Sequence, residues 1–599
     1  MQNLLAVIPI VPHAHGSSFV LKSEQPRDSL STQVDEFAWE KVGLVKPDEL
    51  KWTDCYTRRQ CARLIVPLNH SEPDGAEAVI ALIRKPAAVP ITSPSYRGPI
   101  LFNPGGPGGS GVNMIQGSGD LFGAIVGPNF DVVGFDPRGI SRSTPRASFF
   151  KTDVERSLFG ASLPLANDSV EGISRSWARG RLMGRLATET DDGYLRHINT
   201  DQTAHDMLRI VEAHGRSKIQ YWGFSYGSVL GATFAAMFPD RIERFVIDGV
   251  VDSEDYYATL WSNDLRDTDK VMDSFFEGCH EAGPEDCDFW APSPDDIRHN
   301  LTSIYDSLRS RPIPVKTEKG YGLVDYAMVR GLVFSALYSP FTSFRLLATA
   351  LAALATGDAS LIFDRAFVPP PQCSCDPSDG LFTNVPDAVF TVLCNDGKDV
   401  PGDFASSEKY FEMLSKTSQW AEIWASIRLT CWLAKVPERP FPSCTVKCNS
   451  WITICQGPFI ANTSHPLLLI GNTADPVTPL WAAKKMSKGF EGSVVLTQNS
   501  PGHCSISGPS LCTQKYIREY FISGKLPPPG TVCEVDTTPF SAPPGAPRAK
   551  KPAAAAQKVF DSNSDSSAQR ELEGADEEED EMLQAIMELS RNYAVHTFV

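Results

Sequence analysis

One short motif limits the folds open to this chain more than any other feature of its sequence. Residues 223–227 read Gly-Phe-Ser-Tyr-Gly, which fits the pattern G-x-S-x-G and places Ser225 at its centre. An apolar run at 219–222 precedes the motif, and residues 228–237, rich in small and apolar side chains, follow it. A strand that turns sharply into a helix needs glycine on both sides of the turn residue, and the turn presents that residue above the sheet. In this context the motif predicts a serine nucleophile.

Short apolar runs recur on both sides of the motif, and their arrangement predicts the fold class. A Gly-rich turn or a helical stretch follows each run, which is typical of buried parallel strands. Two apolar stretches between residues 61 and 85 flank a polar turn and predict a hairpin. We therefore expect an α/β fold with a mostly parallel sheet flanked by helices. The runs lie at residues 99–102, 130–135, 219–222, 245–247, 467–470 and 493–496.

The alternation of strands and helices stops between residues 252 and 455, which divides the chain into a sheet-forming part and an insertion. That stretch carries helical patterns, most strongly at 326–355 and 407–433, and predicts a helical cap. We expect an N-terminal arm without regular structure, a first core segment, the cap, a second core segment, and a disordered linker with an acidic tail. These five parts cover residues 1–45, 46–251, 252–455, 456–535 and 536–599.

A serine hydroxyl is a poor nucleophile at neutral pH and needs a base together with a group that orients the base. In this architecture the acid and the histidine follow the serine in chain order, each in a loop after a late strand. Asp475 follows the run at 467–470, and His503 follows the run at 493–496. We therefore predict Ser225, Asp475 and His503 as the catalytic residues. The alternatives are a turn-capping aspartate and a surface-loop histidine.

An acyl-transfer site also needs two backbone N–H groups that face the developing oxyanion. Tyr226, directly after the nucleophile, is expected to supply one of them. The other is expected from the loop after residues 99–102, which reads Asn-Pro-Gly-Gly-Pro-Gly-Gly-Ser at 103–110. The absence of side chains there lets the backbone approach a substrate, with Gly106 as the first candidate donor and Gly105 as the second. The loop lacks the Gly-Lys-Ser/Thr ending of a phosphate-binding loop.

Four ordered motifs together carry a family resemblance. They are Gly-Gly-Pro-Gly at 105–108, Gly-Phe-Asp-Pro-Arg-Gly at 134–139, the elbow around Ser225 and the block around Asp475. The chain resembles α/β-hydrolases of the proline iminopeptidase and tripeptidyl aminopeptidase group, in particular fungal secreted-type members with a TAP-like C-terminal region. The resemblance, which extends over residues 50–535, implies the α/β-hydrolase fold with a helical cap, a serine mechanism, no metal and no cofactor.

The resemblance also has implications for individual loops. Pro104 stands where many iminopeptidases carry a histidine, a change that leaves the oxyanion hole intact. Asp136 and Arg138 are implied to be structural, holding the turn after their strand. Aminopeptidases of this group bind a free N-terminal amine through acidic residues near the cap, and Glu254 and Asp255 are candidates for that contact. The alternative for these two residues is a solvated, helix-capping acidic turn.

Two enzymatic functions remain open at this point. The first is an exopeptidase that removes short N-terminal units from peptides, and the second is a carboxylesterase acting on a small ester such as a natural product. Both pass through an acyl-enzyme, so the triad does not separate them. Epoxide hydrolase and dehalogenase chemistry is disfavoured because those enzymes need a carboxylate where Ser225 stands. The expected partner is therefore a small peptide or ester substrate.

Charge and hydropathy argue against two other classes of protein. The chain has 55 Lys and Arg against 72 Asp and Glu, a net charge of −17. A nucleic-acid binder would need a basic face, so nucleic-acid binding is not expected. No apolar run approaches the ~20 residues that span a bilayer, so no membrane span is expected either.

Much of the negative charge lies near the C-terminus, where residues 577–591 resemble a ubiquitin-interacting motif. An acidic start is followed by a short amphipathic stretch, but Ile586 stands where that motif has a small alanine. A ubiquitin-binding adaptor is therefore a disfavoured, non-enzymatic alternative. The other interpretation is a solvated acidic tail with a transient helix.

The cysteines and the N-glycosylation sequons indicate the cellular compartment in which the protein folds. Fourteen cysteines without a CxxC pair, and without histidine at zinc-ligand spacing, favour disulfides over zinc sites or buried thiols. Sequons at Asn69, Asn167, Asn300 and Asn462 point toward the secretory pathway, although the apolar run at 4–11 is a poor signal peptide. We expect a secreted, disulfide-bonded glycoprotein. The close cysteine pairs are Cys55/Cys61, Cys279/Cys287, Cys373/Cys375, Cys444/Cys448 and Cys504/Cys512.

Overall fold

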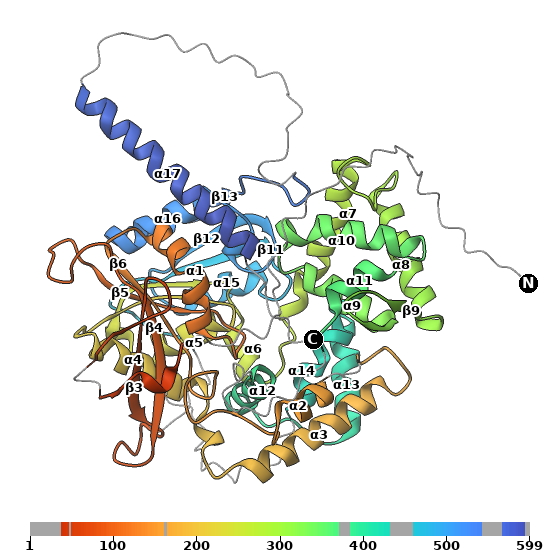
Figure 1. Ribbon diagram of the computed structural model, residues 1–599, viewed down its shortest axis with the longest axis horizontal. Helices are drawn as coiled ribbons and strands as arrows, with labels where there is room; N and C mark the ends of the chain where they lie inside the picture. The colour runs from red at the N-terminus through yellow and green to blue at the C-terminus, as the bar shows by residue number, and fades with distance from the viewer. Residues whose placement is uncertain are drawn as a thin grey trace, which may run out of the picture.

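An eleven-stranded sheet runs through the centre of the protein (Figure 1). The computed structural model describes residues 37–46, 50–160, 165–369, 384–431, 459–541 and 566–592. Ten strands follow the order β1-β3-β4-β6-β5-β7-β8-β11-β12-β13, and β2 pairs with β3 beside this path. The strands are β1 Leu44–Val45, β2 Thr53–Cys55, β3 Arg59–Pro67, β4 Glu77–Lys85, β5 Gly98–Asn103, β6 Phe130–Phe135, β7 Ile219–Phe224, β8 Ile242–Asp248, β11 Leu468–Ala474, β12 Val494–Pro501 and β13 Val532–Glu534.

The direction of these strands decides where the functional loops meet. The strand β4 is antiparallel to β3 and β6, as the predicted hairpin requires, and every pair from β6 to β13 is parallel. The carboxyl ends of parallel strands share one edge of a sheet, so the loops after β5, β7, β8, β11 and β12 gather there. The expected α/β-hydrolase fold with a mostly parallel sheet is confirmed.

Helices cover both faces of the sheet, which explains the continuous apolar runs of its central strands. In β5, Leu101 faces one apolar cluster, while Ile100 and Phe102 face another. The first cluster lies beneath helices α4 (Thr200–Ala213) and α5 (Tyr226–Met237), and the second beneath α1 (Gly111–Val126) and α16 (Leu511–Ser523). Strands buried on both sides need apolar residues at every position, and this removes the two-residue alternation of a half-exposed strand.

The helical cap has its own apolar core and lies beside the carboxyl edge of the sheet (Figure 1). The helical patterns predicted at 326–355 and 407–433 are confirmed, each as two helices. The cap elements are α6 Ser253–Tyr257, α7 Thr268–Ala282, α8 Pro294–Ser310, β9 Ile313–Lys316, β10 Tyr321–Val324, α9 Tyr326–Ala336, α10 Pro340–Ala355, α11 Ser360–Ala366, α12 Val385–Asp396, α13 Phe404–Ser415 and α14 Ala421–Thr430.

The predicted cap boundary at residue 252 is incomplete, because helices α2 (Asp153–Gly160) and α3 (Gly172–Thr190) pack with the cap (Figure 1). The indole N–H of Trp177 on α3 donates to the carbonyl of Gly402, 3.3 Å away. A side chain at Gly180 would overlap the backbone of α14, so this glycine permits the close contact of the two helices. A segment that precedes the nucleophile in sequence therefore also forms the cap.

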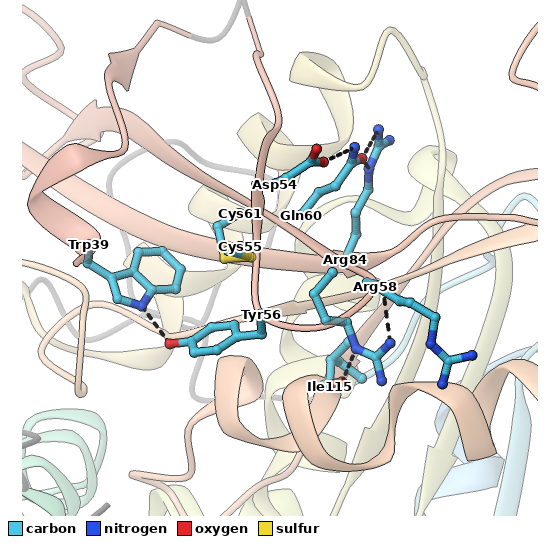
Figure 2. The surroundings of a disulfide bond; sticks show 10 residues. Trp39, Asp54, Cys55, Tyr56, Arg58, Gln60, Cys61, Arg84 and Ile115 are labelled. Atoms are coloured by element: carbon cyan, nitrogen blue, oxygen red, sulfur yellow. Dashed lines mark hydrogen bonds between the residues drawn. A yellow bond between two sulfur atoms is a disulfide. The ribbon is translucent and has the colours of Figure 1, made fainter. Parts of the chain in front are cut away.

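The described end of the N-terminal arm is ordered, contrary to the expected lack of structure up to residue 45. Strand β1 pairs with the outer side of β3, which would otherwise leave unpaired backbone groups at the sheet edge. Figure 2 shows the indole of Trp39 bonded to the Tyr56 hydroxyl, 2.9 Å away, beside the Cys55–Cys61 disulfide that joins β2 to β3.

The acidic tail is also ordered in part, which corrects the prediction of disorder for residues 536–599. Within this range, the structure describes residues 536–541 and helix α17, which spans Ser566–Asn592. The side chains of α17 that face the core follow helical spacing, and this stripe is strong enough to dock despite the surrounding negative charge. The buried residues of the stripe are Met582, Ala585, Ile586 and Leu589.

Four disulfides lie within the described residues. Cys55–Cys61 and Cys279–Cys287 confirm two of the expected close pairs. Cys394–Cys431 and Cys512–Cys533 join residues far apart in sequence. The close pair Cys504/Cys512 does not form a disulfide, because Cys512 bonds to Cys533, whereas Cys504 is a buried thiol that contacts the carbonyl of Asp248. The pairs Cys373/Cys375 and Cys444/Cys448 lie outside the described residues.

The sequons differ in accessibility. Asn167 and Asn462 are exposed and Asn69 is partly exposed, whereas Asn300 is buried within α8. A glycan at Asn300 is therefore incompatible with the fold. Among the helices that the structure describes, none combines the length and the apolar character needed to cross a bilayer.

Candidate active site

Ser225 occupies a sharp turn between the end of β7 and the start of α5. Its backbone has φ 58° and ψ −123°, a conformation that residues with a side chain rarely adopt. The turn is held by the Ser225 N–H, which donates to the carbonyl of Asp248 over 2.9 Å. A side chain at Gly223 would overlap the Tyr221 hydroxyl, and one at Gly227 would lie 2.9 Å from the Asn103 carbonyl. Both glycines of the motif are therefore required by space.

The glycine-rich loop after β5 lies directly against this turn. A Cβ on Gly105 would lie 2.8 Å from the Ser225 Cβ and 3.1 Å from the Tyr226 nitrogen. The N–H of Gly105 is already donated to the Asn103 side chain, 2.9 Å away. Gly106 is therefore the remaining candidate donor from this loop, and the Tyr226 amide lies at the N-terminus of α5.

Two buried charged residues, Asp136 and Arg138, hold the turn after β6, as the family resemblance implies. The Asp136 carboxylate accepts hydrogen bonds from the Ser110 hydroxyl and from the N–H of Val112, which ties the start of α1 to the end of β6. Arg138 forms a bidentate pair with Asp206 at 2.6 and 2.7 Å. Both side chains are nearly inaccessible to solvent and far from free to act on a substrate, so their role is structural.

His503 and Asp475 lie together in the loops after β12 and β11. The Nδ1 atom of His503 is 3.0 and 3.1 Å from the two carboxylate oxygens of Asp475. The carboxylate is fully buried and also accepts the N–H groups of Val477, Thr478 and Cys504 at 2.8–3.0 Å. A carboxylate acceptor requires the proton on Nδ1, which leaves Nε2 of the imidazole as the basic nitrogen.

The cap contributes to the placement of His503, which no sequence pattern indicated. The backbone N–H of His503 donates to the carbonyl of Tyr338, 2.8 Å away, between α9 and α10. The Tyr338 ring meets the imidazole edge-on, with centroids 5.2 Å apart. The base is therefore held on one side by the sheet and on the other by the cap.

Asp248, at the end of β8, links the nucleophile turn to the histidine loop, and sequence reasoning missed it. Its carbonyl accepts the Ser225 N–H, while its carboxylate accepts the N–H of Ser505 at 2.8 Å, the Ser505 hydroxyl and the Trp222 indole. Burial raises the pKa of Asp248 to about 6. An aspartate directly after an apolar strand was the available signal.

One group of potential metal ligands lies close together in the described part of the chain. The ligand atoms of Asp475, His503 and Cys504 are all within 4.8 Å of one another. The Asp475 oxygens are engaged by the hydrogen bonds above, and the Cys504 thiol faces the Asp248 carbonyl. These contacts account for the arrangement without an ion.

The two acidic residues predicted to bind a substrate amine are already engaged. Glu254 is exposed and forms an ion pair with Lys485 at 2.7 Å. Asp255 is buried and accepts hydrogen bonds from Ser262 and Asn263 at 2.6–3.0 Å. The structure therefore gives no support to an amine contact at Glu254 or Asp255.

Asp264 is the acidic residue of this region that stands out in the structure. Its side chain is buried, and its burial together with the charges of Asp255, Asp252 and Asp475 raises its pKa well above the usual range. Asp264 opens the short helix Asp264–Arg266 directly before α7, and the Thr268 hydroxyl at the start of α7 donates to the carbonyl of Pro476 over 2.6 Å. This contact joins the segment that carries Asp264 to the loop of Asp475, although nothing in its sequence context distinguished the residue.

Comparisons with known proteins agree with this geometry. A family model described as alpha/beta hydrolase fold matches residues 98–286, which include Ser225, and one described as TAP-like protein matches residues 438–533, which include Asp475 and His503. The chain is 27% identical over 506 residues to the serine protease Hip1 of Mycobacterium tuberculosis, covering 81% of this chain and 91% of that protein.

Two further relatives have similar sequence identity and coverage. The tripeptidyl aminopeptidase of Streptomyces lividans is 26% identical over 519 residues, covering 82% of this chain and 87% of that protein. Carboxylesterase B of Mycobacterium tuberculosis is 26% identical over 483 residues, covering 79% of this chain and 86% of that protein.

The strand order, the turn at Ser225 and the first family match show that the chain has the α/β-hydrolase fold. Within that class it carries a TAP-like C-terminal region and is related to a serine protease and a tripeptidyl aminopeptidase. The resemblance to the iminopeptidase and tripeptidyl aminopeptidase group is thereby confirmed. The likeness to fungal secreted-type members stays a prediction.

Proposed function

We propose that the protein is a serine peptidase that releases short N-terminal units from peptides through an acyl-enzyme on Ser225. The observation that carries this proposal is the buried His503–Asp475 pair on the same sheet edge as the Ser225 turn. Relatives named as a serine protease and a tripeptidyl aminopeptidase support peptide rather than other acyl substrates. The Ser225, Asp475 and His503 side chains act together as the triad in this proposal.

The first half of the reaction forms the acyl-enzyme. The Ser225 hydroxyl attacks the scissile carbonyl carbon while Nε2 of His503 accepts its proton. Asp475 holds the imidazole in the required tautomer and stabilises the imidazolium. The amides of Gly106 and Tyr226 donate to the oxyanion, and each such donor contributes about 3 kcal/mol to lowering the barrier.

The second half releases the acyl group. The imidazolium of His503 donates its proton to the leaving amine, which departs as the tetrahedral intermediate collapses. A water molecule then attacks the ester carbonyl of the acyl-enzyme, with His503 as its base, and the Ser225 hydroxyl is restored. The steps balance in atoms and charge without a cofactor.

Exopeptidase specificity requires a group that recognises the substrate ammonium, and we assign this role to Asp264. The proposal is supported by the buried position of Asp264 in a segment that Thr268 joins to the Asp475 loop through the Pro476 carbonyl, and by the three carboxylates that raise its pKa. An ammonium beside Asp264 would compensate the unfavourable burial of the carboxylate charge. Glu254 and Asp255 already have partners within the protein. Lys485 forms an ion pair with Glu254, and the turn that follows α6 donates hydrogen bonds to Asp255.

A carboxylesterase is the second candidate function, favoured by the relative named carboxylesterase B. Ester hydrolysis uses the same nucleophile, base and oxyanion donors, so the catalytic geometry is equally suited to it. The two functions differ in whether the free amine of the substrate contributes to binding.

A matched substrate panel tests both proposals. Tripeptidyl and aminoacyl anilides, their N-blocked versions and short-chain nitrophenyl esters are hydrolysed by the wild type, by Ser225→Ala and by Asp264→Asn. We expect turnover of free-amine anilides that is lost in Ser225→Ala. Asp264→Asn should raise KM for these substrates at least about tenfold, because a buried charge pair loses one partner.

The control for this panel is Glu254→Gln, which removes an exposed carboxylate of the same region and should leave KM unchanged. Turnover of esters alone would assign the protein to the esterases. Full activity of Ser225→Ala would exclude the proposed nucleophile, and an unchanged KM in Asp264→Asn would exclude the amine contact.

We also propose that the protein matures in the secretory pathway and is glycosylated. Four disulfides within the described residues support this proposal, because such bonds persist in oxidising compartments. The exposed sequons at Asn167 and Asn462 agree with it. Intact mass before and after reduction and deglycosylation is the direct measurement.

A further inference from the structure

We propose that α17 is a positioning element that holds the loop carrying His503 in its reactive geometry. We call α17 with its docking contacts the C-terminal clamp. The inference rests on the proposed serine mechanism, and it assigns a function to a segment that follows both family matches in sequence.

The apolar stripe of the clamp docks onto the back of the histidine loop. One apolar cluster contains Met582, Ile586 and Leu589 of the stripe. The same cluster contains Cys504 and Ile506 from the loop that follows His503. Ile586 is 1% exposed and Leu589 is 4% exposed, so the stripe is as well buried as the core of the sheet. Figure 1 shows α17 running past β12, β13 and α16 toward the carboxyl edge of the sheet.

A chain of hydrogen bonds connects the clamp to the acid of the triad. The Ser590 hydroxyl donates to the carbonyl of Ser507 over 2.8 Å, and the Ser507 hydroxyl donates to the carbonyl of Cys504 over 2.8 Å. The N–H of Cys504 in turn donates to Asp475 over 2.9 Å. Cys504, which directly follows His503, is therefore linked to α17 through Ser507 and bonded directly to Asp475.

Charge complementarity fixes the register of the helix. Glu578 pairs with Arg518, and Glu579 pairs with Lys515 at 2.5 Å, so acidic residues in the middle of α17 meet two basic residues of α16. Arg518 also donates to the carbonyl of Ile125 over 2.6 Å, at the end of α1. These contacts attach the clamp to α16 and, through Arg518, to the C-terminal end of α1.

The docked state explains the departure of this helix from a ubiquitin-interacting motif. Ile586, which stands at the position of the motif's small alanine, and the neighbouring Leu589 are buried against the hydrolase core. The isoleucine packs in the same apolar cluster as the histidine loop, where it fills space that alanine would leave empty. The stripe is therefore an intramolecular contact surface and is not available to a partner in this state.

The test compares two full-length variants that introduce the same charge on opposite faces of α17. Ile586→Asp places a carboxylate in the apolar stripe, whereas Gln584→Asp places it on the exposed face. Two measurements are made: the rate at which a fluorophosphonate probe labels Ser225, and amide hydrogen exchange of residues 502–508. The probe reports alignment of the nucleophile and base for any serine hydrolase, whatever its natural substrate.

We expect Ile586→Asp to lower the labelling rate about tenfold, since small displacements of a catalytic group are costly. Exchange at Cys504 and Ser505 should become faster, while Gln584→Asp should match the wild type in both measurements. In the substrate panel, kcat should fall and KM should stay within twofold, a pattern that general destabilisation does not produce. Wild-type labelling and exchange in Ile586→Asp would overturn the inference.

If Ile586→Asp fails to fold, a milder pair of variants at Ser590 tests the same inference. Ser590→Ala should lower the labelling rate about fivefold or less, in line with the loss of one hydrogen bond, and Ser590→Thr should restore it. Equal rates for Ser590→Ala and the wild type would overturn the role of the hydrogen-bond chain. Absence of labelling in the wild type would reject the serine mechanism, whereas the exchange measurements would still decide whether the clamp orders the loop.

Discussion

At the scale of single residues, the site depends on positions where a side chain is either absent or strictly held. Ser225 adopts a strained backbone, and Gly105 packs against it with φ +87°. Asp248 bonds to both the Ser225 turn and the His503 loop. Its carbonyl accepts the Ser225 N–H, and its carboxylate accepts the Ser505 N–H. In the proposed mechanism, these contacts would hold Ser225 and the predicted oxyanion donors in place before substrate arrives, which lowers the cost of reorganisation in the transition state.

Replacement of Gly105 by alanine tests this arrangement. The new methyl group would lie 2.8 Å from the Ser225 Cβ, under a backbone conformation that alanine disfavours. We expect kcat to fall at least about 100-fold because the oxyanion donors move, with little change in KM. Steady-state kinetics on the preferred panel substrate is the measurement.

Gly117→Ala is the matched control, because nothing lies within 4 Å of its Cβ position on the exposed side of α1. That variant should keep full activity and gain about 0.5–1 kcal/mol in its free energy of unfolding, as alanine stabilises a helix. Equal activity of the two variants would contradict the close packing of the glycine-rich loop.

Motif spacing predicted a triad whose acid and histidine lie together in the structure, but it did not predict the partners of the acidic residues near the cap. Lys485, more than two hundred residues after Glu254 in sequence, forms an ion pair with Glu254. Asp264 differs from Asp255 only in what surrounds it in space. Long-range contacts of this kind leave no local pattern in the chain.

At the scale of helices and strands, the strands were predictable and the boundaries of the cap were not. Central strands are buried on both faces and therefore read as apolar runs. Helix α3 has an ordinary amphipathic pattern, and its place in the cap depends on the contact at Gly180 with α14. Periodicity reports that a helix forms, whereas its partner is decided by packing.

The sequons give a prediction at this scale. Asn300 lies on the buried side of α8, whereas Asn167 and Asn462 lie in exposed loops. Protein from a secretory host should carry glycans at Asn167 and Asn462 and none at Asn300, as read by peptide mass after deglycosylation in labelled water. The reduced mass should also rise by about 2 Da for each disulfide, with at least four bridges expected from the described pairs. A glycan at Asn300, or a mass unchanged by reduction, would contradict the proposed maturation.

At the scale of the whole molecule, buried histidines couple folding to pH. Burial lowers the pKa of His205 to about 4, with a further contribution from the neighbouring His70. Burial lowers the pKa of His214 to about 4 as well. Below an unfolded pKa near 6.5 the unfolded chain takes up protons that the folded protein does not accept until about pH 4. The free energy of unfolding should therefore fall as the pH is lowered through this window.

The His205→Phe variant isolates one part of this effect. Phenylalanine keeps the ring packing against Phe238, whose centroid lies 5.1 Å from that of His205, and removes the titrating group. Between pH 6.5 and 4 the wild type should lose on the order of 3 kcal/mol more than the variant, measured by urea unfolding at several pH values. Parallel stability curves for the two proteins would show that His205 does not carry this coupling.

The sequence by itself determined the class of fold and the sharp turn at Ser225, and it predicted a triad in chain order. These follow from local rules: glycine where a side chain would clash, apolar runs where a strand is buried on both faces, and polar loops at strand ends. Only the tertiary structure decided that Tyr338 of the cap and α17 of the tail both contact the His503 loop, and that Lys485 pairs with Glu254. Such contacts join residues far apart in the chain, and their energy depends on complementary surfaces that no single segment encodes.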